Sequence, residues 1–183
     1  MSSETVHFQG RYLAMREKDG WEYTSRTNAS GVVVLVAVTP QNEVVLVEQY
    51  RIPVGRRTIE LPAGLVGDGA DPGEDLRLAA ARELEEETGY RAGALEEILY
   101  CPSSAGMADE MITFFLATGL ERVGPGGGDD SEDIVVHEVP LSDVDEWLRQ
   151  QQVGRFLDPK IWTGLYWIRE RLPGGISWPV AIG

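Results

Sequence analysis

Residues 82–89, with the sequence RELEEETG, carry the strongest structural signal in this chain. At the α-helical rotation of about 100° per residue, Glu83, Glu86 and Glu87 fall within roughly 100° of arc, whereas Glu85 points to the far side. The spacing therefore predicts a helix that brings three carboxylates together on one face.

This clustering of like charges needs a physical reason. Like-charged neighbours three and four residues apart destabilise a helix by roughly a few tenths of a kcal/mol per pair. Hard divalent cations prefer oxygen ligands, and Mg²⁺ in particular binds through a few carboxylates together with substrate phosphates. A solvated acidic helix face is the alternative interpretation, because charge runs are commonly exposed.

The residues around the helix favour the cation site. Residues 60–64, Glu-Leu-Pro-Ala-Gly, read as a strand followed by a tight turn, and Ala63 lies between Pro62 and Gly64. The Ala63 carbonyl can therefore turn toward the helix as a further oxygen ligand. Arg82 adjoins the acidic face and can hold a carboxylate in a bidentate pair.

The remaining pattern predicts an α+β (mixed α/β) fold. Before the helix we expect extended segments at 11–17 and 21–27, a buried strand at 31–38, and strands at 43–50 and 58–61. The helix itself is expected to start with Asp71 as its cap, Pro72 in its first turn and Glu74 in a capping box, and to end at Gly89. Further strands are expected at 98–101, 111–118 and 134–139, a mobile loop at 124–130, and helices opening at Ser142 and Asp158.

Composition bounds the function. The 183 residues include 30 Asp and Glu against 16 Lys and Arg, a net charge of −14, which disfavours nucleic acid as a partner. No apolar run is long enough to span a membrane, and residues 1–10 show no signal peptide. Cys101 is the single cysteine. We therefore expect a cytoplasmic protein without membrane association.

At this point the sequence resembles the Nudix hydrolases. Glu74, seven residues, and then Arg82-Glu83-Leu84-x-Glu86-Glu87-x-Gly89 match the Nudix box, a pattern with many fixed positions. Further segments are similar to ADP-ribose pyrophosphatases and related nucleoside diphosphate sugar hydrolases: Trp21-Glu22-Tyr23, Glu48-Gln49-Tyr50-Arg51, Glu60-Leu61-Pro62-Ala63-Gly64 and Glu132-Asp133-Ile134.

The resemblance implies a Nudix α/β/α sandwich at 31–183, preceded by a small N-terminal β segment at 1–30 that would mediate a homodimer. It also implies metal-dependent hydrolysis of the diphosphate of a nucleoside diphosphate sugar, with ADP-ribose as the leading substrate, to a nucleoside monophosphate and a sugar phosphate. The metal would be Mg²⁺, or Mn²⁺, bound by the Ala63 carbonyl, Glu83, Glu86 and Glu87.

Other site residues also follow from the resemblance. The candidates for the general base are Glu132 first, then Glu110, with Asp129 and Asp130 as further alternatives and Glu86 as a shared catalytic carboxylate. The substrate contacts would be Arg51 on phosphate, Trp21 stacking on the base, Glu60, and Gly106 in the loop after the box. Glu74 would support the loop and cap the helix.

Three departures from the family pattern leave the substrate open. Nine residues instead of five separate Gly64 from Glu74, Tyr90 replaces an aliphatic residue, and the loop that usually reads Ser-Pro-Gly is Ser103-Ser104-Ala105-Gly106. The alternatives are GDP-mannose, a broad range of nucleotide sugars, or a (d)NTP. A non-catalytic nucleotide-sugar-binding module is a further alternative, although the box carboxylates are all present.

Overall fold

A computed structural model describes residues 4–67, 73–128 and 132–172. Its helices are α1 (Leu76–Thr88), α2 (Val144–Gln151) and α3 (Lys160–Arg171), with one 3₁₀ turn, η1 (Ile52–Val54). Its strands are β1 (Glu4–Gln9), β2 (Leu13–Lys18), β3 (Trp21–Arg26), β4 (Gly31–Ala37), β5 (Glu43–Arg51), β6 (Arg56–Glu60), β7 (Ala63–Val66), β8 (Tyr90–Arg91), β9 (Ala94–Pro102), β10 (Met111–Thr118), β11 (Glu121–Arg122), β12 (Val135–Pro140) and β13 (Phe156–Leu157).

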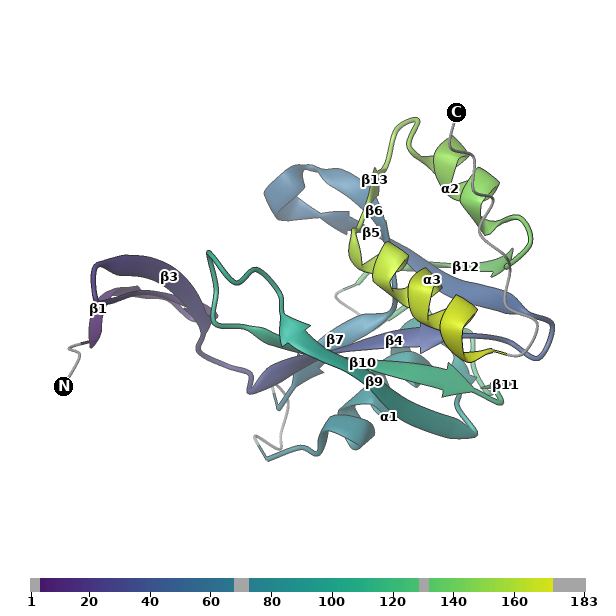
Figure 1. Ribbon diagram of the computed structural model, residues 1–183, viewed down its shortest axis with the longest axis horizontal. Helices are drawn as coiled ribbons and strands as arrows, with labels where there is room; N and C mark the ends of the chain where they lie inside the picture. Colours follow the sequence, from purple (N-terminus) through teal and green to yellow (C-terminus); the bar gives the residue numbers. More distant parts are fainter. Residues whose placement is uncertain (1–3, 68–72, 129–131, 173–183) are drawn as a thin grey trace.

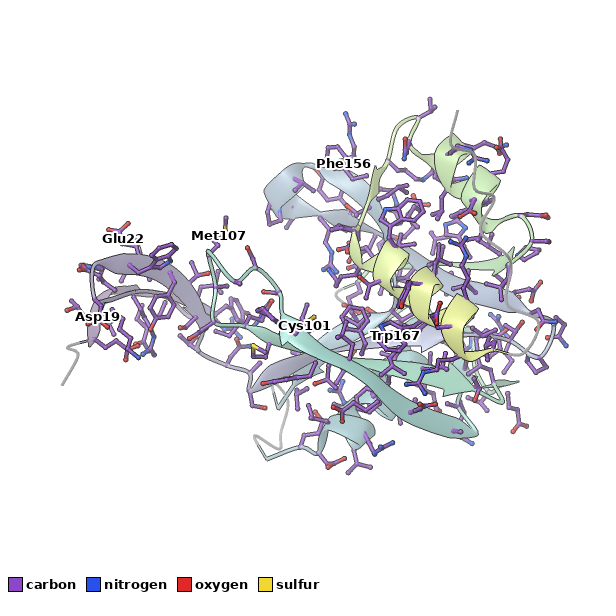
Figure 2. The ribbon with its side chains drawn as sticks, viewed as in Figure 1. Asp19, Glu22, Cys101, Met107, Phe156 and Trp167 are labelled. Carbon is purple, nitrogen blue, oxygen red and sulfur yellow. The ribbon has the colours of Figure 1, made fainter. Side chains whose placement is uncertain are left out.

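The N-terminal strands β1, β2 and β3 form an antiparallel sheet of their own, which projects from the rest of the chain (Figure 1). The strands β2 and β3 overlap the extended segments expected at 11–17 and 21–27, and β1 lies within the N-terminal β segment expected at 1–30. The sheet is tied to the loop between β9 and β10, where the Thr24 amide donates to the Met107 carbonyl at 2.8 Å. Figure 2 shows Met107 at the tip of this loop.

The first large sheet has the order β7-β4-β10-β9 and is covered on both faces. Because side chains alternate along a strand, Val33 and Leu35 of β4 pack toward α1, while Val34 and Val36 join the cluster formed with α2 and α3. Burial of both faces explains why 31–38 is almost continuously apolar. The strand β7 begins at Ala63, where the sequence predicts a tight turn after the short strand that ends at Leu61.

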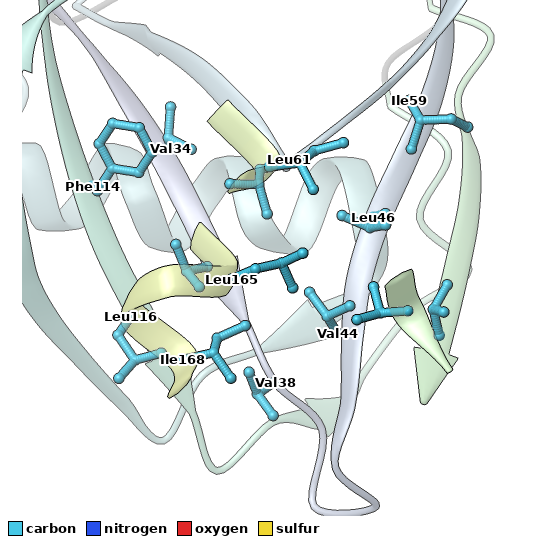
Figure 3. Close-up of a cluster of buried hydrophobic side chains, with 14 of the residues drawn as sticks. Val34, Val38, Val44, Leu46, Ile59, Leu61, Phe114, Leu116, Leu165 and Ile168 are labelled. Carbon is cyan, nitrogen blue, oxygen red and sulfur yellow. The ribbon is translucent and has the colours of Figure 1, made fainter. Parts of the chain in front are cut away.

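The second large sheet has the order β12-β5-β6-β13, and α3 fills the space between the two sheets (Figure 3). Leu165 and Ile168 of α3 share one buried apolar cluster with Val34 from one sheet and Leu46 from the other. Gly164 lets α3 pack closely against Leu61, because a Cβ at position 164 would lie only 2.8 Å from Leu61 Cδ1.

Helix α1 begins later than predicted. Its N-cap is Asp75, whose carboxylate accepts from the amides of Arg77 at 2.8 Å and Leu78 at 3.4 Å. The predicted start at Asp71 is therefore wrong by about one helical turn, and Asp71 and Pro72 themselves lie outside the described residues. The helix ends at Gly89, as predicted, and Gly89 adopts a left-handed conformation with φ 74°.

The architecture confirms the predicted α+β class. Helix α1 covers one face of the sheets, and α2 and α3 cover the other (Figure 1). None of the helices in the described part of the chain has the length and apolar character needed to cross a membrane. The division into segments 1–30 and 31–183 stays a prediction.

Candidate functional site

The predicted acidic face exists on the last two turns of α1. Glu87 is buried, Glu83 has only 12% of its side chain exposed, and Glu86 is half exposed. Glu85 lies on the opposite side, where it pairs with Arg91 at 3.1 Å. The helical period thus separates one solvent-facing glutamate from three that face the neighbouring strand and loop.

Glu87 is the most constrained of the three. Its Oε2 accepts a hydrogen bond from the Ala63 amide at 3.0 Å, which joins the helix to the start of β7. Burial, with contributions from the charges of Glu83 and Glu132, raises the pKa of Glu87 to about 8, although the Ala63 amide and Arg51 oppose the increase. A buried carboxylate of this kind is stabilised in its ionised form by a nearby cation.

Glu83 lies directly against the backbone of Gly64. A Cβ at Gly64 would sit 1.8 Å from the Glu83 carboxyl carbon, so no other residue fits there without displacing Glu83. The Glu-Leu-Pro-Ala-Gly segment and the helix are therefore complementary in shape. The structure brings Ala63, Glu83 and Glu87 together, as the sequence predicts.

Arg82 organises the exposed side of the cluster. It forms a bidentate pair with Glu74, with nitrogen–oxygen distances of 2.9 and 3.1 Å. Its Nη1 also contacts Glu83 at 2.8 Å and Glu86 at 3.0 Å. Glu74 further accepts from the Gly67 amide at 3.2 Å, so it supports the loop as expected but does not cap the helix.

A glycine-rich loop closes the C-terminal end of α1. The amides of Gly127 and Gly128 donate to the carbonyls of Glu87 and Glu86 at 2.9 and 3.1 Å. These bonds satisfy carbonyls that the helix end leaves unpaired, and they hold residues 124–128 where a mobile loop was predicted. Asp129 and Asp130 lie outside the described residues.

Glu132 reaches the site through this loop. A Cβ at Gly128 would lie 2.3 Å from Glu132 Oε2, so the Glu132 side chain lies against the Gly128 backbone. Its charge also raises the pKa of Glu87. The leading base candidate is thus brought to the same helix end as the buried glutamate.

Arg51 and Glu60 form a second element of the site. The guanidinium donates two bonds of 2.7 Å to the Glu60 carboxylate, and Glu60 is buried. Hydrogen bonding to Glu60 raises the pKa of Arg51, and Glu87 contributes to the same increase. This geometry makes Glu60 the partner that orients Arg51, whose side chain is 43% exposed.

Trp21, Gly106 and Glu110 gather elsewhere, at the N-terminal sheet. The Trp21 indole donates to the Gly106 carbonyl at 3.4 Å beside a cavity of about 320 Å³. Glu110 pairs with Arg26 of β3, and both line a cavity of about 230 Å³. Glu110 is therefore held by the N-terminal sheet, whereas Glu132 belongs to the helix cluster.

The donor set fits a hard divalent cation. It offers the carboxylate oxygens that hard cations prefer, and one of these carboxylates, Glu87, is buried and has a raised pKa. They lie beside the start of β7, where Gly64 leaves room for Glu83. Within residues 4–67, 73–128 and 132–172, no three carboxylate, imidazole or thiol side chains converge closely enough to hold a metal alone. Mg²⁺ typically takes one or two carboxylates plus substrate phosphates.

One contact at the site was missed from sequence. Arg57 of β6 contacts Asp133, the residue after Glu132, at 2.8 Å. The two residues lie 76 positions apart, and no local pattern predicts their pairing. An arginine in a strand two residues after a turn reads as an ordinary surface charge.

The model of the NUDIX domain matches residues 27–166, which include α1, β7, the glycine-rich loop and Glu132. This chain belongs to the Nudix family. The match begins directly after β3, the last strand of the N-terminal sheet.

Several curated proteins resemble this Nudix chain. An ADP-ribose pyrophosphatase of Bacillus subtilis is 37% identical over 67% of this chain and 65% of its own length. A methanol dehydrogenase activator of Bacillus methanolicus is 36% identical with the same coverages. An ADP-ribose pyrophosphatase of Mycobacterium tuberculosis is 34% identical over 79% of this chain and 71% of its own. The matched region thus spans about two thirds of the first two relatives.

Structural comparison supports the Nudix fold. The crystal structure of an ADP compounds hydrolase superposes with a TM-score of 0.68, covering 92% of this chain and 90% of that one. At 20% identity this likeness speaks for the fold alone.

Proposed function

We propose that this Nudix chain hydrolyses the diphosphate of a nucleoside diphosphate sugar, with ADP-ribose as the leading substrate, to a nucleoside monophosphate and a sugar phosphate. The observation that carries the proposal is the buried Glu87 beside Glu83, Gly64 and Glu132. The two relatives named ADP-ribose pyrophosphatase support the substrate class.

Glu83, Glu86, Glu87 and the Ala63 carbonyl are the proposed ligands for Mg²⁺, with Mn²⁺ as the alternative metal. When bound, the cation would neutralise charge on the diphosphate and acidify the attacking water. Arg82 holds Glu83 and Glu86 in place, and the Ala63 amide fixes Glu87. The chain thus preorganises oxygen donors that would otherwise repel one another.

Glu132 is the proposed general base, which accepts the proton of the attacking water. Its carboxylate lies against Gly128 at the end of α1, whereas Glu110 is engaged by Arg26. Replacing Glu132 by Gln should lower kcat by roughly 10²-fold with little change in KM. A similar loss in Glu110→Gln alone would favour Glu110 instead.

Arg51 is the proposed phosphate ligand, because a guanidinium fixed by Glu60 keeps donors for a bidentate contact with phosphate. Trp21, beside Gly106, is the proposed stacking surface for the nucleobase, since aromatic faces accept any base. Both assignments follow the family resemblance, and the exposure of the two side chains is compatible with them.

A nucleotide-sugar panel tests the function. ADP-ribose, GDP-mannose, UDP-glucose and dNTPs are incubated with and without Mg²⁺, and the monophosphates released are measured with a coupled phosphatase. We expect the highest kcat/KM on ADP-ribose and no turnover without the metal. No turnover on any member would support a binding module instead.

GDP-mannose is the second candidate substrate. A GDP-mannose pyrophosphatase of Cronobacter sakazakii is 34% identical over 66% of this chain and 65% of its own length. The departure at Ser103–Gly106 lies beside Trp21, the proposed base-stacking residue. A preference for guanine over adenine in the panel would favour this reading.

A homodimer formed through the N-terminal segment is also proposed, in a cytoplasmic protein. The projecting sheet exposes several apolar side chains, namely Val6, Phe8, Tyr12, Leu13, Met15 and Trp21. Patches of this kind mark interaction surfaces in soluble proteins. Light scattering at micromolar concentration should give the mass of two chains, and a monomer would contradict the proposal.

A further inference from the structure

A buried glutamate on β5 collects three basic side chains. Glu48 is 3% exposed, and its carboxylate lies 2.8 Å from Arg57 Nε, 2.9 Å from Arg155 Nε and 3.0 Å from His137 Nε2. Burial pushes the pKa of Glu48 upward, but Arg155, His137 and Arg57 outweigh it, so the pKa is lowered. Glu48 is therefore an ionised anchor within the second sheet.

Arg57 connects this anchor to Asp133, the residue after the proposed general base Glu132. While its Nε binds the Glu48 carboxylate, Nη1 donates to Asp133 Oδ2 at 2.8 Å and Nη2 donates to the Asp133 carbonyl at 3.0 Å. Nη2 also contacts the Glu48 carbonyl at 3.2 Å. All three guanidinium nitrogens are engaged, which fixes the main chain one residue beyond Glu132.

The loop needs such an anchor because its own charges oppose its position. The charge of Glu132 acts on Glu87 and disfavours the ionised form of Glu87. Asp133 adds a further negative charge to a chain with a net charge of −14. Repulsion from the acidic face of α1 would move the loop outward, and Arg57 supplies the attraction that opposes this movement.

We propose that Arg57 is a positioning residue for the reaction: seated on buried Glu48, it holds Asp133 so that the Glu132 carboxylate stays at the end of α1. The inference rests on the proposed function, in which Glu132 is the general base. Charge-assisted, planar recognition of this kind suits arginine and would not be reproduced by lysine.

A double-mutant cycle tests the coupling. Arg57→Gln is expected to lower kcat by about tenfold to a hundredfold, since small misplacements of a catalytic group have effects of that size. In the Glu132→Gln background the same substitution should change kcat by less than about twofold. Equal losses in both backgrounds, or an unchanged kcat in Arg57→Gln, would overturn the proposal.

Two further variants keep the test decisive. Arg155→Gln removes another arginine from Glu48 without touching Asp133, so its kcat should stay within about threefold of the wild-type value. If Arg57→Gln fails to fold, Asp133→Ala replaces it, because the Asp133 side chain is 83% exposed. Its kcat loss should also disappear in the Glu132→Gln background, and a persisting loss would count against the proposal.

Hydrogen exchange separates this inference from the assignment of the base. The Ile134 amide, which donates to the Gly127 carbonyl at 3.3 Å, should exchange at least tenfold faster in Arg57→Gln than in the wild type. Unchanged exchange would refute the anchoring itself. Faster exchange together with wild-type turnover in Glu132→Gln would instead show that the loop is anchored but that Glu132 is not the base.

Discussion

Replacing Glu87 by Gln should remove a large pH dependence from the stability of the metal-free protein. Burial places the folded-state pKa of Glu87 at about 8, against an ordinary value of 4.5. Between these values the folded state holds a proton that the unfolded state releases. The stability contributed by protonated Glu87 is therefore fully present below pH 4.5 and is lost as the pH rises through about 8.

The size of the effect follows from linkage. One pKa unit corresponds to about 1.4 kcal/mol, and integration from pH 5 to pH 9 gives a loss of ~4 kcal/mol for a group with these two pKa values. The glutamine keeps an oxygen for the Ala63 amide but does not ionise. The difference in unfolding free energy between wild type and Glu87→Gln should therefore change by ~4 kcal/mol across this range.

Urea unfolding followed by tryptophan fluorescence, in the presence of a chelator, measures this difference at pH 5 and pH 9. Glu85→Gln is the matched control, because Glu85 is exposed on the opposite side of α1 and should leave the pH dependence unchanged. At pH 9, added Mg²⁺ should increase the unfolding free energy of the wild type more than that of Glu87→Gln. Parallel stability curves for wild type and Glu87→Gln, within about 1 kcal/mol, would refute the reasoning.

Three further predictions concern activity. A chelator should abolish turnover and Mg²⁺ should restore it; turnover that persists in the chelator speaks against the metal site. Gly64→Ala should lower kcat at least about tenfold and the free energy of unfolding by ~1–3 kcal/mol, because the new Cβ overlaps Glu83. Gly31→Ala is the control, since a Cβ there meets only the Met111 carbonyl at an ordinary 3.8 Å. Arg51→Lys should raise KM about tenfold through loss of bidentate phosphate binding, and Glu60→Gln should raise it less; a fall in kcat alone would contradict this role.

The helix and its acidic face were predictable because they depend on local spacing. The 3.6-residue period decides which glutamates share a face, whatever the tertiary structure. The start of the helix was misjudged because Asp71 and Asp75 are both suitable caps, and the choice depends on how the preceding chain packs. The burial of Glu87 could not be read from spacing, since it requires β7 and the glycine-rich loop.

The strands, too, divide into those with a local sequence signal and those that depend on distant neighbours. The apolar run at 31–38 was predicted correctly, because burial on both faces leaves a continuous local signal. The strand β7 was missed because its Ala-Gly-Leu-Val sequence follows a turn and is stabilised by pairing with β4, about thirty residues earlier. The link between Arg57 and Asp133 likewise depends on neighbours distant in sequence.

The position of α3 between the two sheets has a consequence for the proposed site. Glu83 and Glu87 stand on α1, whereas Arg57, which holds the residue after Glu132, is on β6 of the second sheet. The distance between α1 and Arg57 therefore depends on how the sheets pack, which includes the close apolar contacts of Gly164 with Leu61 and Val36. A methyl group at Gly164 would displace Leu61 and Val36, so a small change in the apolar interior is expected to alter the position of Arg57 relative to α1 without touching any of the proposed site residues.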